Sequence, residues 1–308
     1  MKNNKKILFI GESPMLLNCI LFASNFFNKI IVITKDKKIL KHIPKKIQIF
    51  SNINKVNVNK FDFLFSIMNK MIINKKIIQI KKITCLNFHD AYLPNYAGLY
   101  TSSWSILNGE KNHGVTWHKI TNNIDQGDIL LRKKFKIASN DTAMDIDNNS
   151  ITIGFYLFKK IILKILENKK LYFAKQNLKN FKYFGHNDRN KIPNYGFINL
   201  NNKINSIFKI YKALNVSKQK NNKFCKMKLL TNKGILVVKK IELIRNNVNY
   251  QNQKKMINLV NDYFILKKNN KYIKIILEKK NKDKNNFKII NTLNDNLKKY
   301  LNYGLQYD

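Results

Sequence analysis

Two polar side chains stand one pleat apart at the end of a predicted strand. Asn87 and His89 fall at the end of the apolar run 83–88, and alternate residues of a strand point to the same face. One amide and one imidazole can therefore converge on a single oxygen atom and stabilise the negative charge that develops there. A carboxylate from a later loop, Asp125, can hold the imidazole in its charged form and relay protons through water. These residues predict a site for a reaction that builds negative charge on an oxygen.

The elements that would position this site alternate between short β-rich runs and helix-like segments. Strands are expected at residues 6–10, 30–34, 47–50, 61–67 and 83–88, with a helix from the turn at 11–14 to about residue 27. Such alternation implies βαβ units and a mostly parallel sheet. Ligands of these sheets bind at the carboxyl ends of the strands, which places Gly11 and residues 87–90 at the working edge.

The second half of the chain changes character. A helix capped near Asn140 and Asp141 carries an apolar stripe at helical spacing, so it should face the core. Residues 193–196 mark the expected domain boundary. Short strands at 226–230, 235–241, 256–260, 263–266 and 272–277 suggest a small β-barrel, followed by a solvated loop at 279–286. We therefore predict an α/β fold: residues 1–190 form a Rossmann-like domain that carries the site, and residues 196–308 form a C-terminal β-barrel domain.

The charge of the chain is strongly positive, with a formal net charge of +40 at pH 7. Such a charge suggests nucleic acid or another polyanion as a partner. However, Arg132, Arg189 and Arg245 are the only arginines, and Asn and Ile are also unusually abundant. A protein selected to grip phosphate would be expected to keep arginine for bidentate contacts. Compositional drift explains the lysines better than selected polyanion binding, although both interpretations stay open.

Membrane insertion and secretion are not expected. The longest apolar runs fall far short of the roughly 18–20 residues that span a bilayer, and Gly11 follows the first apolar run too early for a signal peptide. The three cysteines, Cys19, Cys85 and Cys225, are odd in number and far apart. They suggest a reducing cytoplasm, with neither a disulfide framework nor a zinc site.

The most informative motifs lie between residues 86 and 129. They read Leu-Asn-Phe-His-Asp at 86–90, Leu-Pro-Asn-Tyr-Ala-Gly at 93–98, His-Gly-Val-Thr-Trp-His at 113–118 and Ile-Asp-Gln-Gly-Asp-Ile at 124–129. In this order they resemble the folate-dependent formyltransferase family, which includes glycinamide ribonucleotide and methionyl-tRNA formyltransferases. That family has an Asn-x-His pair after a strand, then a Leu-Pro loop, then an Asp-x-Gly motif. Here Asp125 follows His89 by 36 residues, as the family pattern requires.

The resemblance implies the formyltransferase fold and a reaction in which an amine attacks the formyl carbon of 10-formyltetrahydrofolate, without a metal. An amide-like formyl donor is poorly electrophilic, so preorganised donors must meet the oxyanion. The catalytic positions of the family fall on Asn87, His89 and Asp125. The folate-binding positions are then expected in the Leu-Pro and Asp-x-Gly loops, at Leu93, Pro94, Ile124 and Gly127.

The acceptor amine is the open part of this interpretation. The motifs at 89–98 and 113–118 are most similar to the formylation domains that start some nonribosomal peptide synthetases, so an aminoacyl group on a carrier protein is the favoured acceptor. Methionyl-tRNA formyltransferases usually have Arg-Gly after the Leu-Pro loop and a long basic insertion after the second strand. Tyr96-Ala97-Gly98 replaces the first here, and residues 34–46 leave no room for the second. Aminoacyl-tRNA and amino sugars stay open as acceptors.

Structural interpretations compete with the catalytic ones. His89 could be a hydrogen-bonded core histidine, and Asp125 could simply form a turn before Gly127. Thr116 and His118, one pleat apart, could support the site or only pack behind it. Two non-enzyme functions also compete: a folate-binding module without turnover, against which the complete triad argues, and a basic RNA-binding protein that uses the fold as a scaffold.

Overall fold

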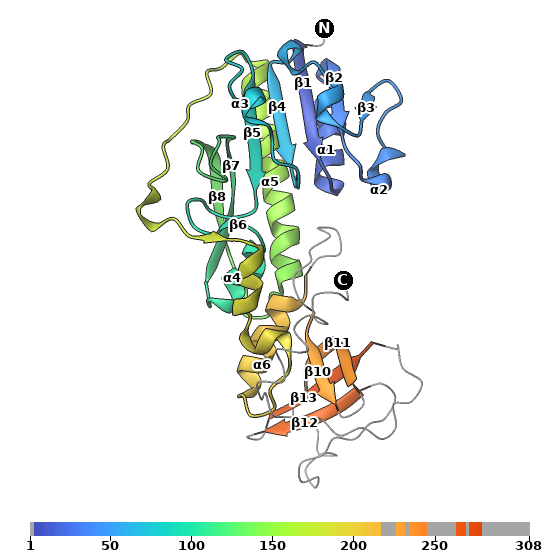
Figure 1. Ribbon diagram of the computed structural model, residues 1–308, viewed down its shortest axis with the longest axis vertical. Coiled ribbons are helices and arrows are strands. Elements are labelled where there is room, and N and C mark those ends of the chain that lie inside the picture. The colour runs from blue at the N-terminus through green and yellow to red at the C-terminus, as the bar shows by residue number, and fades with distance from the viewer. Residues whose placement is uncertain (1–2, 217–225, 232–233, 245–262, 269–270, 279–308) are drawn as a thin grey trace.

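The larger part of the chain folds around a seven-stranded sheet (Figure 1). The computed structural model describes residues 3–216, 226–231, 234–244, 263–268 and 271–278. The strands run in the order β3-β2-β1-β4-β5-β7-β8. Their bounds are Asn3–Gly11 (β1), Phe27–Ile33 (β2), Gln48–Phe50 (β3), Phe63–Ile67 (β4), Thr84–His89 (β5), Asn112–Lys119 (β7) and Ile129–Lys136 (β8).

The strands β1 to β5 pair in parallel, whereas β7 and β8 pair antiparallel. The predicted mostly parallel sheet and its first five strands are confirmed. The sequence did not predict the β7–β8 hairpin. In its second strand the basic run at 132–134 interrupts the alternation of apolar and polar residues.

Helices cover one face of this sheet, and shorter elements cover the other. On the first face, α1 (Pro14–Ser24) and α5 (Ala143–Leu166) bury an aromatic cluster in which Phe65 lies 5.5 Å from Phe9 and 5.1 Å from Phe158. Trp117 is completely buried in the same cluster. The other face is covered by η1 (Ile53–Lys55), η2 (Val58–Lys60) and α3 (Lys75–Ile78), while α2 (Lys37–Leu40) follows β2.

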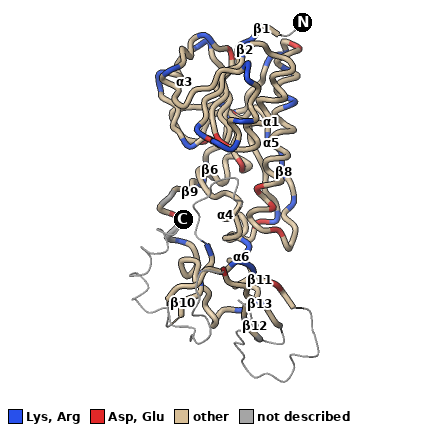
Figure 2. Tube along the Cα trace, turned by 90° about the vertical axis from the view of Figure 1, so that its right-hand side faces the viewer, with Lys and Arg blue, Asp and Glu red and all other residues tan. Residues whose placement is uncertain are grey.

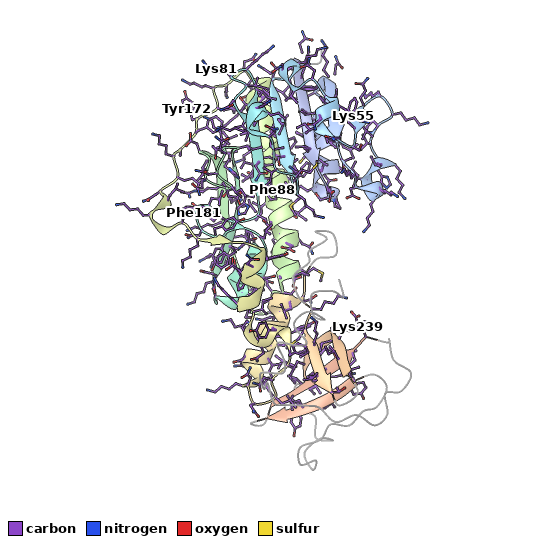
Figure 3. All side chains as sticks on the ribbon, in the orientation of Figure 1. Lys55, Lys81, Phe88, Tyr172, Phe181 and Lys239 are labelled. Carbon is purple, nitrogen blue, oxygen red and sulfur yellow. The ribbon has the colours of Figure 1, made fainter. Side chains whose placement is uncertain are left out.

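The helix α5 fixes the strand that ends in His89. Its N-terminus is held by a capping box between Thr142 and Asp145, close to the predicted cap. A Cβ atom on Gly154 would lie 2.2 Å from the ring of Phe88, so only glycine allows this close approach. Figure 3 shows Phe88 at the middle of the molecule, beside α5. The indole of Trp117 donates to the Gly154 carbonyl at 3.0 Å, which ties β7 to the same helix.

The C-terminal part contains a four-stranded antiparallel sheet in the order β10-β11-β13-β12. Its strands are Lys228–Thr231 (β10), Gly234–Ile244 (β11), Tyr263–Lys268 (β12) and Lys271–Leu277 (β13). The small β-barrel predicted for this part is confirmed as a separate antiparallel half-barrel sheet. The strand predicted at 256–260 and the loop predicted at 279–286 lie outside the described residues.

Two helices connect the two sheets. The helices α4 (Thr101–Leu107) and α6 (Ile204–Leu214) pack together between the sheets (Figure 1). A single buried cluster joins Trp104 of α4, Ile207 of α6 and Ile273 of β13. The sequence did not predict α6, and the cluster crosses the proposed boundary near residues 190–196, so that boundary stays a prediction.

A long connection leads from α5 back to the site. We call residues 167–184 the return segment; in Figure 3 the labelled side chains of Tyr172 and Phe181 belong to it. It contains η3 (Leu178–Asn180) and ends in β9 (Tyr183–Phe184), which pairs with β6 (Ala97–Gly98). The chain continues through η4 (His186–Lys191) and η5 (Pro193–Gly196).

Basic residues are spread widely along the described trace, over the seven-stranded sheet and over the C-terminal part (Figure 2). Among the helices that the structure describes, none combines the length and the apolar character that a membrane span needs.

Candidate active site

Two adjacent strands carry most of the site. Asn87 and His89 end β5, and β7 pairs with it so that Asn87 lies opposite His118 and His89 lies opposite Thr116. The Asn87 amide nitrogen is 3.2 Å from Nε2 of His118. The predicted common face is confirmed, because Asn87 and His89 line the same cavity. The structure adds His118 to the site, which the sequence left undecided between support and packing.

The ring of His89 is held at both nitrogens. Its Nε2 donates to the backbone carbonyl of Tyr96 at 2.8 Å. A carbonyl only accepts hydrogen bonds, so this contact assigns a proton to Nε2. The other nitrogen, Nδ1, lies 3.5 Å from a carboxylate oxygen of Asp125. A second proton on the ring would therefore complete an ion pair with that carboxylate.

The carboxylate of Asp125 sits between two imidazoles. Its Oδ2 faces Nδ1 of His89 and its Oδ1 faces Nε2 of His118, each at 3.5 Å. The backbone N–H of Gly98 donates to Oδ2 at 2.8 Å. Asp125 is 9% exposed, so these contacts lie in an environment with little water to screen them.

These neighbours set the charge of the carboxyl group. Burial alone would raise the pKa of Asp125, because it disfavours the charged form. The charge of His89, the interactions with His118 and the hydrogen bond from Gly98 outweigh burial and lower the pKa to about 2. Asp125 is therefore a carboxylate at neutral pH and presents its negative charge to both imidazoles.

The carbonyl that orients His89 is itself fixed by side-chain contacts. Tyr96 has a left-handed backbone conformation, with φ 59°. Its hydroxyl donates to Glu110 at 2.6 Å and accepts from the Asn108 amide at 3.0 Å, and its ring stacks on Phe184 with centroids 5.4 Å apart. Burial and the hydrogen bond to Glu110 raise the pKa of Tyr96, so the hydroxyl stays a donor.

The motif at residues 113–118 holds the loop that follows β5. The Thr116 hydroxyl donates to the Ala91 carbonyl at 2.7 Å and accepts from the Leu93 N–H at 3.1 Å. Nε2 of His113 lies 2.7 Å from the carbonyl oxygen of Asp90. Thr116 thus supports the site from a fully buried position. Most of this motif is scaffold, and His118 is its member that reaches the cavity.

The site opens into a cavity of about 1290 Å³ at the carboxyl ends of β1, β2, β4 and β5. This confirms the expected working edge of the sheet. The volume exceeds the roughly 300–1,000 Å³ of an ordinary small-molecule site. Part of the lining is apolar, and Ile72 in it is 86% exposed. Its apolar residues include Met68, Met71, Ile72, Ile73, Ile120 and Ile124.

The four residues expected to bind folate are placed differently from one another. Ile124 lines the cavity and is 51% exposed. Leu93 is fully buried against Ile129, and neither it nor its neighbour Pro94 is among the residues that line the cavity. Gly127 also lies outside the lining and packs on backbone, since a Cβ there would lie 1.9 Å from the Lys119 carbonyl oxygen. Folate contact by these four stays a prediction, supported by position for Ile124.

The other chemistry that the described side chains could support is metal binding or a reactive thiol. Over the part of the chain that the structure describes, no group of three or more His, Cys, Asp or Glu side chains is arranged to hold a metal ion. Cys19 and Cys85 are free and buried. Burial raises the pKa of Cys85 to about 12, so it is not a reactive thiolate at neutral pH.

Comparison with known proteins agrees with this geometry. Residues 33–155 match the family model described as formyl transferase. The chain is 31% identical over 191 residues to the bifunctional polymyxin resistance protein ArnA of Wigglesworthia glossinidia brevipalpis, which covers 60% of this chain and 28% of that protein. It is 36% identical over 107 residues to the methionyl-tRNA formyltransferase of Clostridium tetani, which covers 35% of this chain and 34% of that protein.

A solved structure extends the likeness along the chain. WlaRD, a sugar 3-N-formyltransferase crystallised with dTDP and 5-N-formyl-tetrahydrofolate, superimposes with a TM-score of 0.60 and 25% identity, covering 91% of this chain and 100% of that one. By contrast, this chain spans only 28% and 34% of the lengths of the two curated relatives. The two histidines and the carboxylate of the cavity thus lie within the residues that match the formyl transferase model, and the chain is similar to methionyl-tRNA and sugar N-formyltransferases.

Proposed function

We propose that this protein is an N-formyltransferase that moves a formyl group from 10-formyltetrahydrofolate to a primary amine. The observation that carries the proposal is the buried Asp125 carboxylate, 3.5 Å from the imidazoles of His89 and His118, at a cavity that Asn87 also lines. We assign the catalytic roles to Asn87, His89 and Asp125.

Each of these groups has a distinct task in the transfer. The neutral amine attacks the formyl carbon to form the new C–N bond, and the bond from that carbon to the folate nitrogen breaks. Asn87 and protonated His89 stabilise the oxyanion formed between these events. Asp125 keeps His89 charged and passes the proton lost by the amine, through water, towards the leaving nitrogen.

The apolar part of the cavity lining supports a flat heterocyclic ligand such as the folate pterin. Ile72 and Ile124 are largely exposed there, and Met68 and Met71 adapt to the shape of a ligand. Covering these side chains would remove apolar surface from water and stabilise binding by about 25 cal/mol per Å². We retain Leu93, Pro94, Ile124 and Gly127 as the proposed folate-binding positions.

Separate observations favour two different acceptors. The motifs at 89–98 and 113–118 favour an aminoacyl group on a carrier protein, although most residues of the second motif are buried scaffold. The match over the full length of a sugar 3-N-formyltransferase favours an amino-sugar nucleotide. Aminoacyl-tRNA is the third candidate, because methionyl-tRNA formyltransferases are among the relatives.

Direct competition tests these proposals. The purified protein receives 10-formyltetrahydrofolate with an aminoacyl carrier protein, an amino-sugar nucleotide and charged initiator tRNA, and mass spectrometry identifies the formylated product. We expect saturable transfer to a primary amine, with a rate about 10²–10³-fold lower in the His89→Ala variant.

Two outcomes would replace the proposal. Tight folate binding without transfer to any amine would make the protein a folate-binding module. RNA binding with a steep salt dependence, again without transfer, would support the basic RNA-binding interpretation. Fast formylation of charged tRNA alone would overturn the carrier-protein preference.

A further inference from the structure

The return segment reaches the active site through one amide side chain. The Nε2 of Gln176 donates to the backbone carbonyls of Asp125 at 2.9 Å and Gly127 at 2.7 Å. Its Oε1 is buried and has no hydrogen-bond partner among the described residues. The opposite amide orientation would press this oxygen against two carbonyl oxygens, so the two donated bonds fix the orientation.

The turn that Gln176 holds is a strained one. Asp125 adopts φ 56°, in the left-handed region that residues other than glycine rarely occupy. Two residues later, Gly127 packs so closely on the Lys119 carbonyl that a Cβ atom would clash. Such a conformation persists only when surrounding contacts impose it. Gln176 supplies two of those contacts, from 51 and 49 residues further along the chain.

The segment around Gln176 is anchored on both sides of that contact. Just before it, Ala174 and Ile129 exchange backbone hydrogen bonds at 2.8 and 2.9 Å. After it, Ala97 donates to the Lys182 carbonyl at 2.9 Å and Leu99 donates to the Phe184 carbonyl at 2.7 Å.

The anchors at Ala97 and Leu99 also hold the backbone N–H that contacts the Asp125 carboxylate. Gly98 lies between Ala97 and Leu99, and its N–H donates to Oδ2 of Asp125. A side chain on Gly98 would collide with the Phe184 carbonyl oxygen, since a Cβ there would lie 2.3 Å from it. The return segment therefore fixes the main chain of Asp125 through Gln176 and its carboxylate through Gly98.

We propose that Gln176 is a positioning residue, which acts by holding the Asp125 carboxylate between the two imidazoles. This inference rests on the proposed formyl transfer for its kinetic consequences, but the hydrogen-bond clamp exists independently of any activity. Gln176 itself touches no reacting atom, so its effect should pass entirely through Asp125.

The kinetic test uses Gln176→Met, which keeps the length of the side chain and removes its donors. We expect the loss of these two hydrogen bonds to lower kcat roughly tenfold. The KM for the folate donor should change by less than about twofold. The kcat of Gln176→Glu, which keeps the size and polarity of the side chain but also lacks its donors, should fall by a similar factor. Lys175→Ala, an exposed neighbour, serves as the matched control and should match wild type.

A double-mutant cycle separates positioning from a general structural role. In an Asp125→Asn background, Gln176→Met should lower kcat by less than about twofold further, because the group it positions has been disabled. An equal fold-loss in both backgrounds would overturn the proposal. So would full activity of both Gln176 variants.

A measurement without substrate distinguishes failure of this inference from failure of the proposed function. Hydrogen exchange of the Gly98 amide, followed by NMR, should be about tenfold faster in Gln176→Met than in Lys175→Ala, since its bond to the carboxylate loosens. Unchanged exchange would overturn the clamp even in an active enzyme. Faster exchange in a protein without formyl transfer would uphold the clamp and reject only the function.

Discussion

The two halves of the candidate site are built in different ways. Asn87, His89 and His118 project from paired internal strands of the sheet, where ladder hydrogen bonds and the packing of Phe88 on α5 fix the backbone. Asp125 projects from a loop, in a strained conformation. Three other segments hold it: the return segment, the main chain at Gly98 and the imidazoles themselves.

The difference shows what fixes the positions of the catalytic side chains in each half of the site. A strand sets the direction of its side chains by local geometry, so Asn87 and His89 share a face whatever surrounds them. A loop has no such rule, and it keeps one geometry only while distant contacts hold it. The strand-borne half should therefore tolerate mutation of its surroundings, and the loop-borne half should be sensitive to it.

The largest loss of activity should follow mutation of His89 in the strand-borne half of the site. His89→Ala removes the imidazole whose positive charge stabilises the oxyanion, so we expect kcat to fall by about 10²–10³-fold while the thermal midpoint stays close to wild type. His42→Ala is the matched control, because His42 is exposed and distant in sequence. Steady-state kinetics with 10-formyltetrahydrofolate and the accepted amine measure the effect. Substantial turnover in His89→Ala would refute the assigned mechanism.

Loss of the Asp125 charge should lower kcat somewhat less than loss of the His89 imidazole. Asp125→Asn keeps the size of the side chain but no longer favours a charged imidazole, and we expect kcat to fall by about 10²-fold. Because the strands position His89 independently, KM for folate should change little. A loss larger than that of His89→Ala would mean that the carboxylate, and not the imidazole, dominates catalysis.

Distorting the loop without touching a polar side chain tests the comparison directly. In Gly127→Ala the new Cβ meets the Lys119 backbone, which cannot yield, so we expect a loss of about 1–3 kcal/mol in the free energy of unfolding and a lower kcat. Gly185→Ala is the control, since its nearest neighbour is the side chain of Tyr183 at 3.2 Å. Urea unfolding and kinetics measure both quantities. Wild-type values for Gly127→Ala would show that the loop is not tightly held.

The smallest expected effect is a dependence of stability on acid pH. The pKa of Asp125 is lowered from 3.8 to about 2 in the folded protein, so its charged form stabilises the fold at pH values above about 4. This contribution, about 2 kcal/mol, should disappear as the pH falls from about 4 to 2, because protonation then breaks the pairing with the histidines. The difference in urea stability between wild type and Asp125→Asn should shrink over that range. A constant difference would show that the carboxylate is not paired in the folded state.

Sequence patterns by themselves determined much of this protein. The strand–helix alternation gave the parallel part of the sheet, and the apolar stripe gave α5 and its buried face. The pleat placed Asn87 and His89 on one side, and the ordered motifs identified Asp125 although it lies 36 residues beyond His89. All of these rest on local periodicity or on motif order, which a linear sequence displays directly.

Only the tertiary structure decided the rest. It brought His118 beside Asn87 through a strand pairing, set the Tyr96 carbonyl against His89, and aimed Gln176 at a turn some 50 residues away. It also buried Leu93, one of the residues for which the sequence had suggested folate contact. These are hydrogen bonds and packing contacts between segments far apart in the chain. No local spacing encodes them, because their geometry exists only after the strands have paired and the return segment has docked.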